Sequence, residues 1–153
     1  MSNSLEHFID PKCVLLNLAG TDRKSVLLEL TQCLTHVYPN LNRDHILQGL
    51  LNREKDGSTG IGHGVAIPHI RTSYTQEILL AFGRSEKGIE FDAVDQAPVH
   101  FFFVLLAPEE GSYLKILAKI SQLCMRESFC EELIKCQTPA DLLQCLHEEE
   151  NEK

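Results

Sequence analysis

The segment from residue 53 to residue 69 holds the residues of this chain that are best suited to chemistry, and it reads REKDGSTGIGHGVAIPH. Pro68 biases the preceding residue away from helix, so we expect the chain to stay extended into His69. A neutral imidazole is a good nucleophile near pH 7, because its pKa of about 6.5 leaves it mostly unprotonated. Phosphoryl transfer asks a protein mainly for positioning and charge stabilisation, and the fork of N–H donors on Arg53 can stabilise charge. The residues alone leave two interpretations of His69 open: a nucleophile that accepts a phosphoryl group, and a hydrogen-bonded histidine in a tight turn.

Glycines alternate with other residues in the loop that leads to this histidine. Such glycines leave backbone N–H groups uncovered on one side, and with neighbouring hydroxyls these groups can bind an anion. The predicted phosphate-binding residues are Ser58, Thr59, Gly60, Gly62 and Gly64. The G-x-G-x-G spacing after a predicted helix differs from the dinucleotide fingerprint, and no Gly-Lys-Ser/Thr triplet of a P-loop is present. His63 and His69 are six residues apart across a proline, so they do not form the H-E-x-x-H motif of zinc proteases.

The elements that must position this segment follow from hydrophobic spacing. Apolar runs predict strands at 13–19, 78–84 and 99–107, a brief extended piece at 65–67 and a short edge strand at 89–91. Helical spacing predicts a helix capped by Thr21 or Asp22 that ends at Pro39, one from Asn42 to about Lys55, and others at 112–125, around 129–134 with Ile134 inward, and from Thr138 onward. This order predicts a single α/β domain with a mixed β-sheet and helices on both faces. The nearly continuous apolar run at 99–107 is expected to be a central strand.

Composition argues against several classes of function. The chain has 153 residues and a net charge of −8, which suits neither a nucleic-acid backbone nor an anionic membrane surface. The longest apolar run, 101–107, is far shorter than the ~18 residues that span a bilayer, and the N-terminus resembles no secretory signal. None of the six cysteines has C-x-x-C spacing, so we expect buried thiols in a reducing cytoplasm rather than disulfides or a zinc site.

Several motifs together resemble one protein family. They are Arg53-Glu54, 57–62, 64–69, 91–95 with Pro98-Val99, and 103–108. This set looks like the signature of enzyme IIA domains of the bacterial phosphotransferase system, of the fructose/mannitol type (type 2) and most closely the nitrogen-regulatory enzyme IIA. The resemblance covers about residues 10–146.

The resemblance implies the fold of mannitol/fructose-type enzyme IIA over residues 10–147, with an N-terminal extension at 1–9 and a solvated acidic tail at 148–153. It implies that His69 accepts phosphate from an HPr-like carrier, that Arg53 stabilises the phosphate charge, and that no metal or organic cofactor is required. The phosphorylation state would then regulate partner proteins that the sequence does not identify. The chain shows no IIB, IIC or HPr segment, which favours this regulatory role over a sugar-transport enzyme IIA that passes phosphate to a IIB domain.

One residue departs from the family pattern. The family usually has a second histidine at the start of the helix that follows Ala107-Pro108, and this chain has Tyr113 there. Tyrosine can donate a hydrogen bond to phosphate, but its pKa near 10 makes it a poor proton carrier at neutral pH. The departure keeps open a binding module that works without phosphate, whereas a metal-dependent enzyme lacks ligand spacing.

Two further residues have two interpretations each. His63 either contacts phosphate or the donor, or is a loop histidine, and Arg71 either steers phosphate or is a solvated charge. His100 is expected to be a hydrogen-bonded structural residue of the buried strand, and Asp92 and Asp95 are expected to be turn residues.

Overall fold

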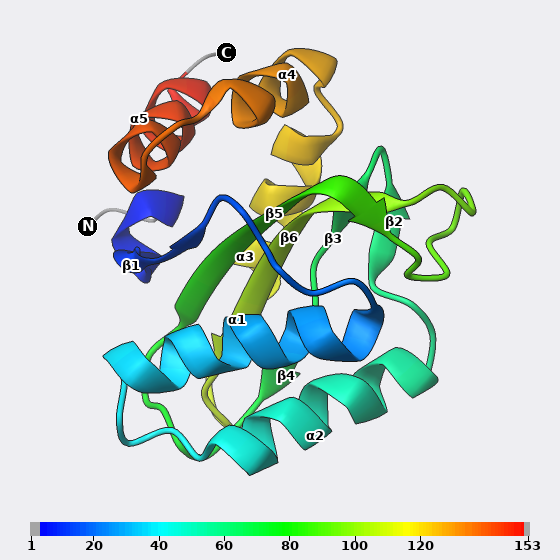
Figure 1. Ribbon diagram of the computed structural model, residues 1–153. Helices are drawn as coiled ribbons and strands as arrows, with labels where there is room; N and C mark the ends of the chain where they lie inside the picture. The colour runs from blue at the N-terminus through cyan, green and yellow to red at the C-terminus, as the bar shows by residue number, and fades with distance from the viewer. Residues whose placement is uncertain (1–3, 152–153) are drawn as a thin grey trace.

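The computed structural model describes residues 4–151 and contains one mixed β-sheet between two layers of helices (Figure 1). The strands run in the order β1-β5-β6-β3-β2, and β4 pairs with β6 beyond β3. Their bounds are β1 Ile9–Leu15, β2 Gly60–Gly62, β3 Val65–Ala66, β4 His69–Arg71, β5 Leu79–Ile89 and β6 Val99–Ala107. A 3-10 turn, η1, precedes them at Leu5–Phe8, and the helices are α1 Arg23–Val37, α2 Arg43–Lys55, α3 Leu114–Cys124, α4 Glu127–Lys135 and α5 Pro139–Glu150.

β6 is the central strand, as predicted. Eight of its nine residues are buried, and it pairs antiparallel with β5 on one side and parallel with β3 and β4 on the other. β3 lies opposite Phe101 and Phe102, and β4 lies opposite 105–107, so the two short strands follow one another along the same edge of β6. The Ile67-Pro68 step between them brings His69 into line with Leu105.

Two strand predictions are wrong. The first strand begins at Ile9 rather than 13 and ends at Leu15, because the following residues turn toward α1 and Leu18 donates its N–H to Arg84 O at 3.0 Å. The predicted edge strand at 89–91 does not form, since Ile89 is the last residue of a longer β5 and pairs with Val99.

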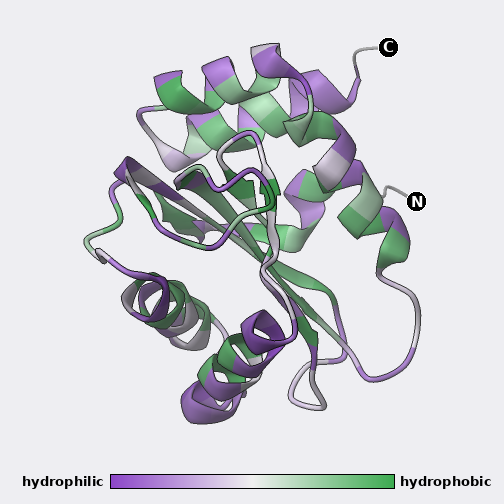
Figure 2. Ribbon diagram, turned by 90° about the vertical axis from the view of Figure 1, so that its right-hand side faces the viewer, coloured by the Kyte–Doolittle hydropathy of each residue, from purple (hydrophilic) through white to green (hydrophobic). Residues whose placement is uncertain are grey.

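The helices cover both faces of the sheet, which confirms the predicted architecture. α1 and α2 pack on one face, and α3, α4 and α5 lie on the other with η1 (Figure 1). In Figure 2 the hydrophobic sides of α1 and α2 turn toward the sheet and their hydrophilic sides face outward. The predicted caps are present: Asp22, Asn42 and Thr138 each accept a hydrogen bond from a backbone N–H in the first helical turn.

Residues 148–150 continue α5, and the prediction of a solvated tail is wrong for Glu149 and Glu150, although Glu148 is exposed. Glu149 is only 9% exposed. Glu150 accepts a hydrogen bond from Leu5 N at 2.7 Å and lies 3.2 Å from Lys119 Nζ. The buried Leu5 packs against α5, so the first and last described segments of the chain hold each other in place. The domain limits of 10 and 147 stay a prediction, and residues 1–3 and 152–153 lie outside the described range.

The orientation of Ile134 differs from the prediction. We expect this side chain to face inward from its sequence position, but it is 65% exposed, because the buried face of α4 is made by Phe129 and Leu133.

All six cysteines are free thiols. Burial raises the pKa of Cys124 well above its ordinary value, so this thiol is protonated at neutral pH. In the described part of the chain, no helix is long and apolar enough to cross a membrane.

Candidate functional site

His69 is the first residue of β4, and its ring is only half-buried. Its Nδ1 lies 2.6 Å from the carbonyl oxygen of Ile67, two residues earlier. A carbonyl oxygen can only accept a hydrogen bond, so Nδ1 carries the proton and Nε2 carries the lone pair. The extended step through Pro68, whose carbonyl accepts from Leu105 N at 2.9 Å, sets this geometry. The ring is thus held by the backbone just before its own strand, and the lone pair of Nε2 accepts no hydrogen bond within the described residues.

A buried carboxylate connects α2 to this histidine. Glu54 is 4% exposed, and it accepts hydrogen bonds from Thr59 N at 3.0 Å and from Thr59 Oγ1. Thr59 O in turn accepts from Ile67 N at 3.0 Å, and Ile67 O is the acceptor for His69 Nδ1. This chain of bonds runs from the last turn of α2, across the loop, to the imidazole. The sequence analysis named Glu54 only as part of a motif and gave it no role, although its position one helical turn after the buried Leu50 places an acid on the inner face of α2.

The predicted phosphate loop is a packed hairpin. The Ser58 hydroxyl donates to Phe91 O at 2.5 Å and accepts from Gly60 N at 3.0 Å. A Cβ at Gly60 would lie 2.7 Å from Ala93 Cβ, so only glycine permits this close approach. Because the Ser58 and Thr59 hydroxyls both donate inside the protein, binding of phosphate by these side chains requires those bonds to break.

Gly62 and Gly64 are needed in this loop because of their backbone conformation. Gly62 has φ of 96° and Gly64 has φ of 76°, values that L side chains rarely adopt. Gly64 O accepts from His100 N at 2.8 Å and from Phe101 N at 3.0 Å, which ties the loop to β6. These glycines therefore shape the approach to β3 and β4.

Arg53 lies in the last turn of α2 and points its guanidinium at the loop. Its Nη1 donates to Gly57 O at 2.7 Å. Among residues 4–151, no hydrogen bond or ion pair joins Arg53 to His69. α2 does pack on β4, where Gly49 leaves room for the Ile70 side chain, but Ile70 and His69 point to opposite faces of the strand.

Tyr113 lies beside His69. Their ring centroids are 5.9 Å apart at an interplanar angle of 48°. Tyr113 is the N-cap residue of α3, yet its side chain makes no capping hydrogen bond. The structure therefore brings the tyrosine predicted from the family pattern next to the imidazole, on the face of the sheet that α3 covers.

The other histidines lie apart from this ring. His63 is exposed at the loop tip with φ of 59°, and its N–H is 3.3 Å from Asp95 Oδ2. His100 places Nδ1 2.9 Å from Ser85 O, which confirms its structural role. Within the described residues, no three His, Cys, Asp or Glu side chains are placed to share a metal ion.

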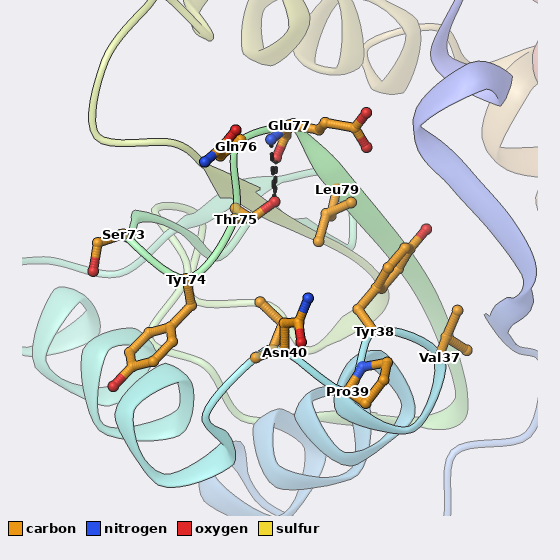
Figure 3. Close-up of a pocket in the computed structure, with 11 residues that line it drawn as sticks. Val37, Tyr38, Pro39, Asn40, Ser73, Tyr74, Thr75, Gln76, Glu77 and Leu79 are labelled. Carbon is orange, nitrogen blue, oxygen red and sulfur yellow. Dashed lines mark hydrogen bonds between the residues drawn. The ribbon is translucent and has the colours of Figure 1, made fainter.

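A surface hollow of about 490 Å³ lies between the end of α1 and the 73–77 turn. Figure 3 shows Tyr38 and Tyr74 on opposite sides of it, with Asn40 between them. Burial raises the pKa of Tyr38 above its usual value, so its phenol is neutral. Neither His69 nor Tyr113 lines this hollow.

A profile of the family "Phosphoenolpyruvate-dependent sugar phosphotransferase system, EIIA 2" matches residues 7–149. The chain is 34% identical over 149 residues to the "Nitrogen regulatory protein" of Pseudomonas aeruginosa, covering 96% of this chain and 97% of that protein. It is 30% identical over 137 residues to the "PTS system fructose-specific EIIABC component" of Bacillus subtilis, covering 88% of this chain but spanning only 22% of that longer protein. The crystal structure of nitrogen regulatory protein IIA-Ntr from Neisseria meningitidis superimposes with a TM-score of 0.88 and 29% identity, covering 93% of this chain and 98% of that one.

Proposed function

Because this chain belongs to the EIIA type 2 family of the phosphoenolpyruvate-dependent sugar phosphotransferase system, we propose that it carries a phosphoryl group on His69. The observation that supports this site most directly is the bond from His69 Nδ1 to Ile67 O, 2.6 Å long, on a half-exposed ring. This bond leaves the Nε2 lone pair facing away from the backbone. A nucleophile with one fixed tautomer needs no proton transfer before it attacks.

The proposed step is an in-line transfer between two imidazoles. His69 Nε2 attacks the phosphorus of a phosphohistidine on the donor, the new N–P bond forms, and the N–P bond to the donor ring breaks. The donor ring recovers its lone pair, and the His69 Nδ1 proton stays on its bond to Ile67 O. The positive charge that the imidazolium gains is stabilised by that carbonyl. Both rings form equivalent bonds, so the step is near balance and reversible.

The oxygens of the phosphoryl group need donors. We assign them to the Arg53 guanidinium, to the Tyr113 hydroxyl and to backbone N–H groups of the loop 60–64. Of these N–H groups, those of Gly60 and His63 must first leave Ser58 Oγ and Asp95 Oδ2. Arg53 reaches the group only if its fork turns from Gly57 O, an exposed bond that costs little to exchange. Tyr113 already lies beside the ring.

The donor we propose is an HPr-like phosphocarrier, and the outcome is control of partner proteins by the phosphorylation state. Similarity to the Nitrogen regulatory protein of Pseudomonas aeruginosa over 97% of its length supports this regulatory role. A partly exposed imidazole also suits a protein partner, whereas a small substrate is usually held in a concave pocket.

The test is labelling with phosphoenolpyruvate, enzyme I and an HPr-type protein, followed by mass-spectrometric mapping. We expect one acid-labile phosphate on His69 and none in His69→Ala. The control is His36→Ala, an exposed histidine of α1 outside the site, which should label normally. Labelling that persists in His69→Ala would defeat the site assignment.

A second candidate is a sugar-transport enzyme IIA. It is favoured by the 30% identity to the fructose-specific EIIABC component of Bacillus subtilis. The phosphorylated chain would then pass its phosphate to a purified IIB domain within minutes, whereas a regulatory protein would retain it. Pull-downs with unmodified chain and with His69→Asp distinguish both from a phosphate-independent binding module, which would bind its partners equally in the two forms.

A further inference from the structure

Arg71 lies two residues after His69 on the same short strand. Side chains alternate between faces along a strand, so Arg71 and His69 point to the same face and Ile70 to the other. The contacts agree: both Arg71 and His69 lie against Tyr113, whereas Ile70 packs at Gly49 of α2. The arginine therefore belongs to the surroundings of the imidazole rather than to an unrelated patch of surface.

The guanidinium holds the loop that carries Tyr113. Arg71 Nη1 donates to Pro108 O at 2.8 Å and to Glu109 O at 3.3 Å, both in the connection from β6 to α3. Its Cζ lies 4.8 Å from the centroid of the Tyr113 ring, within the range of a cation–π contact. One side chain thus fixes both the backbone before α3 and the ring at its first turn.

The tyrosine itself has an uncommitted donor. In the part of the chain that the structure describes, its hydroxyl makes no hydrogen bond, and its side chain does not cap α3. Arg71 likewise has no carboxylate partner among residues 4–151, so its charge stays uncompensated although the chain is acidic overall. Free donors and a free positive charge beside a nucleophile are what an incoming phosphoryl group requires.

We propose that Arg71 is a positioning residue for phosphoryl transfer: it holds Tyr113 beside His69 so that the phenol O–H donates to an oxygen of the phosphoryl group on Nε2. This proposal rests on the function proposed above. It also gives a role to the one residue that departs from the family pattern, because the cation–π contact with Arg71 orients a phenol ring that makes no hydrogen bond within the described residues.

The experiment uses the full chain and potassium phosphoramidate, a small-molecule donor, so that no partner protein contributes. The P–N bond of phosphoramidate breaks, the bond from phosphorus to His69 Nε2 forms, and ammonia leaves. Initial loading rates are measured by mass spectrometry for the parent, Arg71→Gln, Arg71→Lys, Tyr113→Phe and the double variant Arg71→Gln/Tyr113→Phe. Thermal melting followed by circular dichroism verifies that each variant is folded.

We expect Arg71→Gln and Tyr113→Phe each to slow loading about tenfold, the effect of losing one hydrogen bond to a charged group. The double variant should be no slower than either single one, because both remove the same donor. Arg71→Lys should resemble Arg71→Gln, since an ammonium lacks the planar fork that stacks on a ring and bonds two carbonyls at once. Arg126→Gln is the control and should load at the parental rate. Arg126 donates to Glu149 O of α5 at 3.0 Å and pairs with the Glu149 carboxylate at 3.6 Å, on a different helix from Tyr113.

Parental loading rates in both Arg71 variants, or additive losses in the double variant, would overturn the proposal and leave the carrier function intact. If Arg71→Gln does not fold, Arg71→Lys decides. Failure of the parent to load on His69 with phosphoramidate and also with the carrier proteins would instead defeat the proposed function, and the role of Arg71 with it.

Discussion

The two sides of His69 are built differently. On the α2 side, Glu54, Thr59 and Ser58 satisfy one another and the backbone, and both hydroxyls donate inside the protein. On the α3 side, Tyr113 and Arg71 contact each other, but each still has N–H or O–H donors that make no hydrogen bond within the described residues. Under the proposed function, the two sides have different roles. The first side holds the imidazole in place, and the second supplies donors for an incoming phosphoryl group.

The largest expected effect comes from removing the buried carboxylate. Glu54→Ala leaves the N–H and hydroxyl of the 4% exposed Thr59 without their acceptor, at a cost of about 1–3 kcal/mol in the free energy of unfolding. The loop then becomes less rigid, so the rate of His69 phosphorylation and the free energy of unfolding should both decrease. Urea denaturation and labelling rates measure both.

The control for this variant is Glu90→Ala, an exposed acid that should change the free energy of unfolding by less than about 0.5 kcal/mol. If Glu54→Ala labels at the parental rate despite lower stability, the α2 side does not position His69, and the comparison between the two sides fails.

A smaller effect is expected from Tyr113→His. A neutral imidazole can donate to phosphate as a phenol does and can also carry a proton at neutral pH, so loading of His69 should become several-fold faster and the lifetime of the phosphohistidine should change. Stopped transfer assays and phosphate release over time measure these two quantities. Equal rates and equal lifetimes in the two proteins would show that the identity of this residue is unimportant.

The smallest expected effect is electrostatic and involves the whole surface. With a net charge of −8, the chain should attract a basic carrier, so the rate of transfer from a basic HPr-type donor should fall as ionic strength rises. Transfer from phosphoramidate, which has no basic surface, should depend on salt much less. A salt-independent rate with the protein donor would exclude this steering.

Much of the site's framework was predictable, because it depends on neighbours in the sequence. Asn42 caps α2 through His45 N, and Thr138 caps α5 through Asp141 N. The apolar residues of β6 could only be a strand covered on both faces. Other boundaries were missed where distant packing decided them, as at the end of α5, whose last turn is held by Leu5 from the other end of the chain.

By itself, the sequence determined the helix caps, the central strand and the glycine-shaped loop, and it left His69 with two interpretations. The caps and the loop depend on backbone preferences or hydrogen bonds between residues a few positions apart. Only the tertiary structure decided that Arg71 holds Tyr113, that Glu54 is buried against Thr59, and that Arg53 bonds Gly57 O instead of facing His69. A charged side chain has several possible partners within reach, and the register of β4 on β6 together with the placement of α3 selects among them.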